Sequence, residues 1–451
     1  MNDIKNFKEI IFDLIKLSLP ILGGNISHIL INITDTIVAG RYSTLALGAT
    51  SVATAIIMTI IIGSIGIILS ISPVVANNRG AKIPSKKFFK LTVLFSFLIS
   101  LPFFFFVEFF TSKIHLLGLN SELVEPCTIY LQICAWSIFP SAVFVAIKEF
   151  LQAYENVLFT NTLMFFMVIL NLILNIIFAF GFEYSFIHIP EMGVKGLAIA
   201  TLISKTIPMI VIILYCFPLF INHSKRTYED SKKYIKDLLK TGFPISAAMF
   251  FEFLGFNLTA VLIGKFSALY AGVHNIILCI ANFTFMIALS ISNAASIKIG
   301  FYNGKNDIKN ILKYSLCCYF SIILVCLIMF IVIILFNNQI LSLFTRDKEV
   351  IVLAKKIIKI ALCFLFFDGI QCASNGILKG LKETKIIAFT MLAGYILIAI
   401  PYGSIMAFKF GIVLEGFWTG LALALFTAAI VTTSRVVYIL KKSGKITPFD
   451  C

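Results

Sequence analysis

Charged residues are scarce in this sequence. Asp, Glu, Lys and Arg make up 13% of the 451 residues, and 59% of the residues are apolar. A soluble domain usually has about 25% charged residues. Apolar runs of about 20 residues recur along the chain, and each is long enough to cross the ~30 Å hydrocarbon core of a bilayer. The composition therefore excludes an ordinary soluble domain and predicts an all-α, polytopic membrane protein.

Enzyme motifs are also missing. The sequence contains no Walker A loop, no HExxH or GxSxG motif and no glycine-rich dinucleotide loop. The ten cysteines are scattered and form no CxxC…CxxC array of the kind that binds zinc, so we interpret them as small buried apolar residues. We expect no enzymatic activity, no ATPase and no cofactor other than a coupling ion.

The net charge of +15 would suit a nucleic-acid-binding protein, but the placement of the charge argues against it. Basic residues concentrate in short segments between apolar runs, such as 79–90, 225–240 and 298–313. The positive-inside rule places these segments and both termini in the cytoplasm. The first apolar run does not end at a small-residue cleavage site, so we interpret it as a span and not as a signal peptide. We expect a multi-pass protein of the inner or plasma membrane, in contact with lipid and not with nucleic acid.

Twelve membrane-spanning helices are expected, and the longest hydrophilic stretch divides them into two groups of six. We interpret this stretch, 222–239, as a cytoplasmic linker between an N-lobe at 1–221 and a C-lobe at 240–451. The expected spans cover residues 14–39, 50–76, 89–110, 127–147, 159–181, 194–221, 240–263, 270–296, 313–335, 353–378, 387–408 and 413–439.

The two halves resemble each other. A constant spacing along the chain relates the pairs Pro20 and Pro244, Gly40 and Gly264, Ser43 and Ser267, and Gly48 and Gly272. Because each half has six spans, such repeats have the same orientation in the membrane and are related by an axis along its normal. Transporters built in this way place their substrate and ion sites between the two lobes. The pattern therefore predicts two pseudo-symmetric six-helix lobes.

Polar residues form stripes on three of the expected spans. Spacings of three and four residues place on one helix face Asn25, His28, Asn32 and Asp35 in the first span, Asn171 and Asn175 in the fifth, and Asp368, Gln371, Cys372 and Asn375 in the tenth. We interpret the two stripes that contain a carboxylate as the lining of a cavity. The asparagine pair fits hydrogen bonding between helices equally well.

Two carboxylates lie deep inside expected spans. Glu252 and Asp368 are both far from the ends of their apolar runs. An ionisable group in a bilayer costs on the order of 2.5–3.5 kcal/mol on insertion scales, so it usually faces a water-filled path or a bound cation. Together with Gln371 and Asn375, these carboxylates offer oxygen ligands that suit a hard monovalent cation such as Na⁺, or they can exchange a proton.

Two other charges allow more than one interpretation. Asp35 lies nearer to the outer end of its span, where it either lines the cavity or pairs with Arg41 outside the membrane. Lys205 lies deep in the sixth span, where it either pairs with a carboxylate across a cleft or extends its ammonium group outward.

The ordered set of motifs resembles the multidrug and toxic compound extrusion (MATE) family. The residues that carry the resemblance are Pro20, Thr34-Asp35-Thr36-Ile-Val-Ala-Gly40, Pro244, Phe250-Phe251-Glu252, Phe367-Asp368-Gly and Gly376-Ile-Leu-Lys-Gly380. The resemblance covers about residues 14–440 and is greatest to the NorM-type branch. It implies two six-helix lobes arranged as a V around a central cavity, and export that is coupled to entry of Na⁺ or H⁺.

The resemblance also implies roles for individual residues. Glu252 and Asp368 correspond to the pair that is associated with the coupling cation, which makes them a candidate Na⁺ site. Asp35 corresponds to an N-lobe acid associated with protonation or coupling, and its candidate partners there are Asn32, Asn171 and Asn175. The chain departs from the family pattern in two places. Asn175 stands near the position of an acidic residue in DinF-type relatives, and Phe364 replaces a tyrosine that lies near the cation in some relatives.

The expected function is a secondary active multidrug antiporter. By alternating access, it would export small organic, cationic compounds in exchange for Na⁺ or H⁺, and it would act as a monomer. The acidic candidates favour cationic cargo. A flippase for lipid-linked precursors, from the same superfamily, is the alternative, although such flippases often have two more spans and a cationic cavity. A receptor or scaffold is a third class, but it would not need carboxylates in the middle of the membrane.

Overall fold

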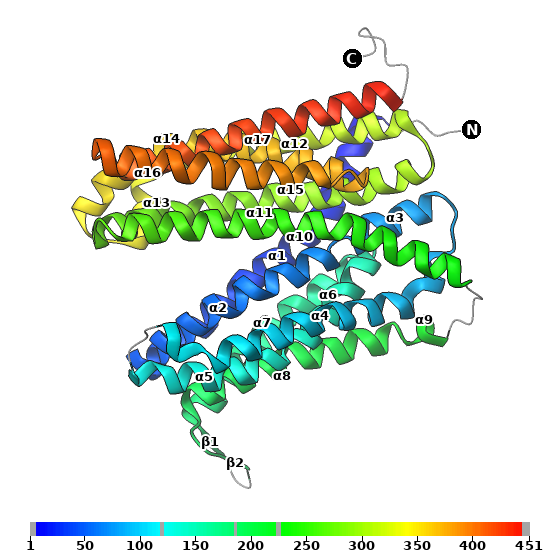
Figure 1. Cartoon of the computed structure of the whole chain (residues 1–451). Coiled ribbons are helices and arrows are strands. Elements are labelled where there is room, and N and C mark those ends of the chain that lie inside the picture. Colours follow the sequence, from blue (N-terminus) through cyan, green and yellow to red (C-terminus); the bar gives the residue numbers. More distant parts are fainter. Residues whose placement is uncertain (1–5, 118–120, 185–186, 222–226, 444–451) are drawn as a thin grey trace. The chain divides into compact units, whose positions relative to one another are not determined.

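The computed structural model describes residues 6–117, 121–184, 187–221 and 227–443, and nearly all of them are helical (Figure 1). The helices of the first half are α1 (Phe7–Tyr42), α2 (Thr44–Ile68), α3 (Ile71–Gly80), α4 (Phe89–Ser112), α5 (Ser121–Trp136), α6 (Ile138–Ala153), α7 (Leu158–Phe180), α8 (Gly193–Tyr215) and α9 (Phe217–Ile221). The second half contains α10 (Tyr228–Gly264), α11 (Ala268–Gly304), α12 (Ile308–Leu335), α13 (Asn337–Phe344), α14 (Lys348–Gly380), α15 (Lys385–Met391), the π-helical turns η3 (Leu392–Ala399), α16 (Ile400–Phe410) and α17 (Leu414–Ser443).

Eleven helices in the described part of the chain are long and apolar enough to cross a membrane, compared with twelve expected. Helix α14 covers the expected tenth span but is not one of the eleven. This 33-residue helix carries Lys355, Lys356 and Lys359 in its first part and Asp368 further on. The polytopic all-α membrane fold is confirmed, and the number of twelve spans stays a prediction.

One short hairpin was not expected from the sequence. Strands β1 (Phe182–Tyr184) and β2 (Ile187–Ile189) pair in antiparallel fashion between α7 and α8 (Figure 1). Gly181 ends α7 with a φ of +79°, a backbone conformation that side chains with a Cβ atom rarely adopt. The glycine therefore allows the chain to leave the helix and enter the hairpin.

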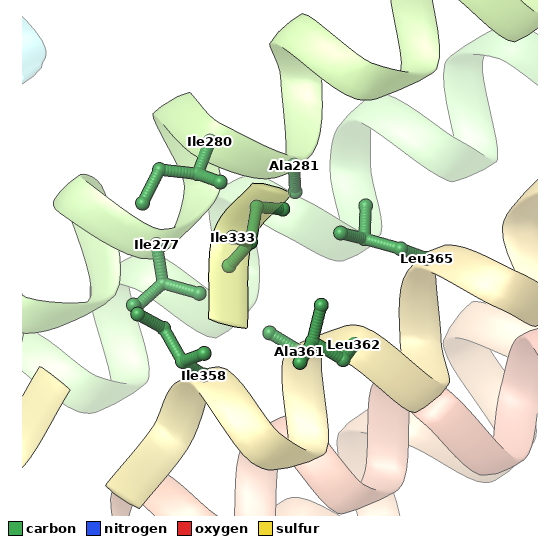
Figure 2. A pocket seen from close by; sticks show the side chains of 8 residues that line it. All are labelled: Ile277, Ile280, Ala281, Ile333, Ile358, Ala361, Leu362 and Leu365. Carbon is green, nitrogen blue, oxygen red and sulfur yellow. The ribbon is translucent and has the colours of Figure 1, made fainter. Parts of the chain in front are cut away.

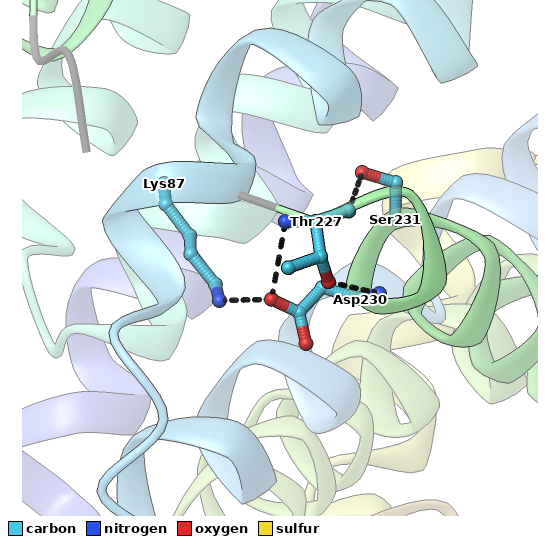
Figure 3. A network of polar contacts seen from close by, with 4 residues as sticks. All are labelled: Lys87, Thr227, Asp230 and Ser231. Atoms are coloured by element: carbon cyan, nitrogen blue, oxygen red, sulfur yellow. Dashed lines mark hydrogen bonds and ion pairs between the residues drawn. The ribbon is translucent and has the colours of Figure 1, made fainter. Parts of the chain in front are cut away.

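The second part of the expected linker at 222–239 is helical, because α10 begins at Tyr228, and the role of this stretch as a linker stays a prediction. Thr227 and Asp230 cap the helix reciprocally: the Asp230 N–H donates to Thr227 Oγ1 at 3.1 Å, and the Thr227 N–H donates to Asp230 Oδ2 at 3.4 Å. Asp230 also forms an ion pair of 2.6 Å with Lys87 (Figure 3). Residues 222–226 lie outside the described residues.

The chain divides into two compact units, which differ from the expected lobe boundaries at three places. Unit 1 comprises 1–22, 76–83 and 247–451, and unit 2 comprises 23–75 and 84–246. The first part of α1 and residues 76–83 therefore belong with the C-terminal helices, and the first part of α10 belongs with the N-terminal helices.

Side-chain contacts explain where the first parts of α1 and α10 belong. Within unit 1, the Tyr314 hydroxyl of α12 donates to Asp13 Oδ2 of α1 at 2.9 Å. Within unit 2, the Tyr234 ring of α10 stacks on Phe88 with a centroid distance of 4.5 Å, and its hydroxyl lies 2.8 Å from Thr92 Oγ1. Each of these helices is long enough for its two parts to pack against different sets of helices.

Small residues allow the helices of unit 2 to approach closely. Its apolar core joins α1, α2, α5 and α8, and it includes Ala39, Ala49, Ala53, Ala135 and Ala198, each fully buried. Small side chains favour close helix contacts in membranes, where van der Waals packing replaces the hydrophobic effect between helices. The polar side chains of α1 are held on this scaffold.

A glycine contact fixes α14 against α11 in unit 1. A Cβ atom added to Gly376 would lie 2.4 Å from the carbonyl oxygen of Ser292, so only glycine fits there. The Ser292 hydroxyl donates to the backbone oxygen of Cys372 at 2.7 Å. These contacts hold the part of α14 that carries Asp368, Gln371 and Asn375.

Two serines at repeat-related positions begin equivalent helices. Ser43 accepts a hydrogen bond from the Ala46 N–H at the start of α2, and Ser267 accepts one from the Leu269 N–H at the start of α11. Both serines have extended backbone conformations. The repeat seen in the sequence therefore corresponds to the same local structure in each half.

Candidate functional site

Glu252 of α10 and Asp368 of α14 both belong to unit 1. Asp368 is 5% exposed and Glu252 is half-buried. Phe256, one turn after Glu252, and Phe364, one turn before Asp368, have ring centroids 6.1 Å apart, so α10 and α14 meet at the level of the two carboxylates. Like charges in a poorly solvated site repel, so the pair requires a proton or a cation between its two groups. The structure therefore brings together the two carboxylates that the sequence singled out.

Gln371 and Asn375 follow Asp368 on the same face of α14. Gln371 is 2% exposed, and within the described residues its Nε2 donates to Met391 Sδ alone, at 3.6 Å, a weak interaction. Asn375 Oδ1 is buried and has no hydrogen-bond partner among the described residues. An unpartnered amide oxygen on the same helix face as a carboxylate can act as an oxygen ligand of a hard monovalent cation. No group of three His, Cys, Asp or Glu side chains in the described ranges could hold a transition metal.

Phe364 occupies the position where some relatives have a tyrosine. Its side chain is 2% exposed and packs edge-on against Trp418, with a centroid distance of 5.5 Å. It therefore packs in the core of unit 1 and provides no oxygen ligand.

A second acidic site lies in unit 2, where α1 meets α7. Asn175 Nδ2 donates to Asp35 Oδ1 at 2.6 Å and to Asn171 Oδ1 at 3.1 Å. The Thr34 hydroxyl lies 2.9 Å from the same Asn171 oxygen. Asn171 and Asn175 are fully buried, whereas Asn32 is exposed and its side chain makes no hydrogen bond within the described part of the chain. The structure thus joins Asp35, Asn171 and Asn175 and leaves Asn32 outside the network.

The contacts of Asp35 bear on one of the two interpretations of that residue, the ion pair with Arg41. Asp35 bonds to Asn175 and forms no ion pair with Arg41 in the described structure. Thr34 and Ser204 belong to the network but were not among the sequence candidates. Ser204 Oγ lies 3.5 Å from Asn171 Nδ2. The sequence marks Thr34 as a candidate through its position next to Asp35. No feature of the sequence marks Ser204, because its helix α8 reaches the network through tertiary packing.

Lys205 follows neither of its two expected interpretations. Its ammonium group donates to Ser137 Oγ at 3.2 Å, inside unit 2. Among the described residues, no carboxylate lies within ion-pair distance of it. Lys205 is therefore a half-buried cation that is held by a hydroxyl group.

A small pocket in unit 1 is entirely apolar (Figure 2). It lies between α11, α12 and α14, and its cavity volume of about 10 Å³ is at the lower limit for a single water molecule. Its lining consists of Ile277, Ile280, Ala281, Ile333, Ile358, Ala361, Leu362 and Leu365. This lining provides no oxygen or charge, so the pocket cannot hold a coupling cation.

Comparison with known proteins places the chain in a family. The MatE family model matches residues 20–177 and 244–405. The probable multidrug resistance protein NorM of Photorhabdus laumondii is 28% identical over 449 residues, with 96% of each chain covered. The multidrug resistance protein NorM of Vibrio cholerae is 25% identical over 456 residues, with 98% of each chain covered. The eukaryotic MATE transporter AtDTX14 is similar in structure, with a TM-score of 0.85, 18% identity and coverage of 97% of this chain and 99% of that one.

The two matched blocks begin at Pro20 and Pro244, the prolines that first indicated the internal repeat. Together the blocks cover most of the chain, and the structural similarity extends over nearly all of it. The chain therefore belongs to the MatE family and has the fold of the MATE transporters.

Proposed function

We propose that this protein is a secondary active multidrug efflux antiporter, which exports organic compounds in exchange for Na⁺ or H⁺. The relatives that match nearly the whole chain are named as multidrug resistance proteins NorM. The observation that carries the proposal is the pair Glu252 and Asp368, two carboxylates on facing helices of an apolar helical unit, next to the contact between Phe256 and Phe364. Such a pair is costly in a membrane unless it binds and releases a cation.

The cargo, on this proposal, is cationic. The carboxylates attract a positive charge, and the aromatic side chains of the same unit can contact the face of a flat organic cation. Cargo and coupling ion then compete for the same negative charge, so binding of one favours release of the other. Each charge that crosses a potential of 100 mV supplies about 2.3 kcal/mol, which is enough for modest uphill export with one or two ions.

Asp35 is the second acidic group in this mechanism. Its carboxylate is held by the amide of Asn175, which is itself held by Asn171, so a change in the charge of Asp35 alters the hydrogen bonds between α1 and α7. The charge distribution of the loops supports a location in the inner or plasma membrane with both termini in the cytoplasm. The protein acts as a monomer on this proposal.

Transport of a cationic dye in inverted membrane vesicles tests the function. Dye movement is measured under a Na⁺ gradient alone and then under a proton gradient alone. Glu252→Gln and Asp368→Asn are expected to abolish coupled transport under the gradient that drives the wild type. Glu349→Gln is the matched control, because Glu349 is an exposed carboxylate at the start of α14.

Coupled transport that persists in both site variants would contradict the roles of the two carboxylates. Protein that reaches the membrane but moves no cationic dye under either gradient would overturn the antiporter proposal and favour the flippase.

A further inference from the structure

A cluster of buried polar side chains in unit 1 has no hydrogen-bond partners. Its members are Thr259 of α10, His274 of α11, Tyr395 of η3 and Trp418 of α17, and each is at most 1% exposed. Five of their polar atoms lack a partner among the described residues: Thr259 Oγ1, both ring nitrogens of His274, the Tyr395 hydroxyl and Trp418 Nε1. Buried polar groups are nearly always hydrogen-bonded, and buried Tyr and Trp usually find a partner for their O–H or N–H.

Aromatic contacts connect the members of this buried polar cluster. The rings of His274 and Trp418 have a centroid distance of 5.6 Å, and Trp418 contacts Phe364 at 5.5 Å. Phe364 in turn lies 6.1 Å from Phe256, which lies 5.3 Å from Tyr395. Ring contacts therefore link three of the four unpartnered side chains, His274, Trp418 and Tyr395, within unit 1.

The same region adjoins the carboxylate pair. Glu252, Phe256 and Thr259 are spaced by four and three residues on α10, so they share one helix face. Phe364 precedes Asp368 by four residues, about one turn, on α14. Tyr395 packs against α10 within one turn of Glu252, since a Cβ atom added to Gly255 would lie 2.7 Å from the Tyr395 side chain. The cluster is therefore an extension of the Glu252–Asp368 site along the helix axes.

The chemistry of the five atoms identifies their partner. Trp Nε1 can only donate, the two hydroxyl groups can donate or accept, and a neutral imidazole donates with one nitrogen and accepts with the other. An apolar ligand would leave all of these groups unsatisfied, a cation cannot accept a hydrogen bond from Trp Nε1, and an anion would be repelled by the two carboxylates. Water both donates and accepts, and buried waters typically make about three hydrogen bonds to such groups.

We propose that Thr259, His274, Tyr395 and Trp418 form an internal hydration site, whose ordered waters complete the coordination of the coupling cation at Glu252 and Asp368. The presence of water in the cluster is independent of the proposed function, whereas its action on the cation rests on it. A cation that enters an apolar helical unit loses its hydration shell, and waters held by fixed side chains replace part of that shell. The hydration site thereby strengthens cation binding without adding a charge.

Hydroxyl-radical footprinting of the full-length protein in lipid nanodiscs tests for the water. Radicals generated from bound water oxidise aromatic side chains beside it, so Tyr395 and Trp418 are expected to be modified despite their burial. Tyr234 is the matched control: it is 2% exposed, and its hydroxyl is already paired with Thr92. Phe417 is a second control, because it is fully buried and has no polar atom. Modification of Tyr395 and Trp418 no greater than that of Tyr234 and Phe417 would overturn the proposal.

A second measurement tests the action on the cation. Tyr395→Phe and Thr259→Val remove a hydroxyl group and preserve the shape of the side chain. Each is expected to raise the cation concentration for half-maximal efflux about fivefold, which corresponds to the loss of one ordinary hydrogen bond. Tyr234→Phe is the control and is expected to leave this concentration unchanged.

The two measurements separate the proposals. Unchanged cation dependence in both variants would refute the action of the waters on the cation, even if the footprinting detects water. Strong modification of Tyr395 in a protein that moves no dye would refute the antiporter function and retain the hydration site.

Discussion

Gly376 provides a direct test of how the carboxylate site is positioned. A Cβ atom at this place in α14 would lie 2.4 Å from the carbonyl oxygen of Ser292 and 2.9 Å from its carbonyl carbon. Both are backbone atoms of α11, so no change of rotamer can remove the clash. Gly376→Ala must therefore push α14 away from α11 near Gln371 and Asn375.

The magnitude follows from a matched pair of variants. Overpacking in a tightly packed core costs about 1–3 kcal/mol. Gly272→Ala is the control, because Gly272 lies within helix α11 and a Cβ atom there would meet nothing within 4 Å. Ala is favoured over Gly in a helix by about 0.8–1 kcal/mol at either position, so this gain cancels when the two variants are compared.

Thermal unfolding in detergent measures the difference. A change of 1 kcal/mol shifts the Tm of a domain of 150–250 residues by about 2–4 °C, so Gly376→Ala should unfold about 2–12 °C below Gly272→Ala. It should also require more cation for half-maximal efflux, because the ligands of α14 are displaced. A Tm difference below about 2 °C would refute the claim that this backbone contact holds the site.

Three other results are expected. Asn175→Leu should slow efflux about ten- to a hundredfold, because the Asp35 carboxylate loses a hydrogen bond of 2.6 Å. Efflux at the wild-type rate would show that this bond has no part in coupling. Lys205→Met should keep or raise the Tm, because it removes a half-buried ammonium whose one hydrogen-bond partner in the described part of the chain is Ser137. A fall in Tm of more than about 4 °C would mean that Lys205 stabilises the fold. Lys87→Met should lower the Tm only slightly, since its partner Asp230 is 42% exposed, and the loss should shrink at high salt. A fall in Tm of more than about 4 °C that does not change with salt would contradict a screened ion pair.

The carboxylate sites could be predicted in part because their signal is local. The spacing of Asp368, Gln371 and Asn375 places them on one helix face whatever else the chain does, and the same holds for Asn171 and Asn175. The sequence also contains a signal for the start of α10, because Thr227 and Asp230 have the spacing of a capping box. The many charged residues of the segment instead favour the prediction of a linker.

The partners across helices could not be predicted in the same way. Asn32 and Asp35 lie on the same face of α1, yet of these two only Asp35 forms a hydrogen bond with Asn175 in the described structure. The packing of α1 against α7 decides which residue of that face comes within reach of Asn175. The buried polar cluster draws one residue from each of four elements, and no spacing within the sequence relates them.

The sequence by itself determined that the chain spans a membrane, that its halves repeat, and which faces of its helices are polar, because composition and periodicity act within single segments. Only the tertiary structure decided that the first parts of α1 and α10 belong to different units from their remaining parts. It also decided that Tyr395 packs against Phe256 and Trp418 against Phe364. The physical reason is that contacts between helices depend on surfaces that many distant residues form together, such as the close approach of Gly376 to Ser292.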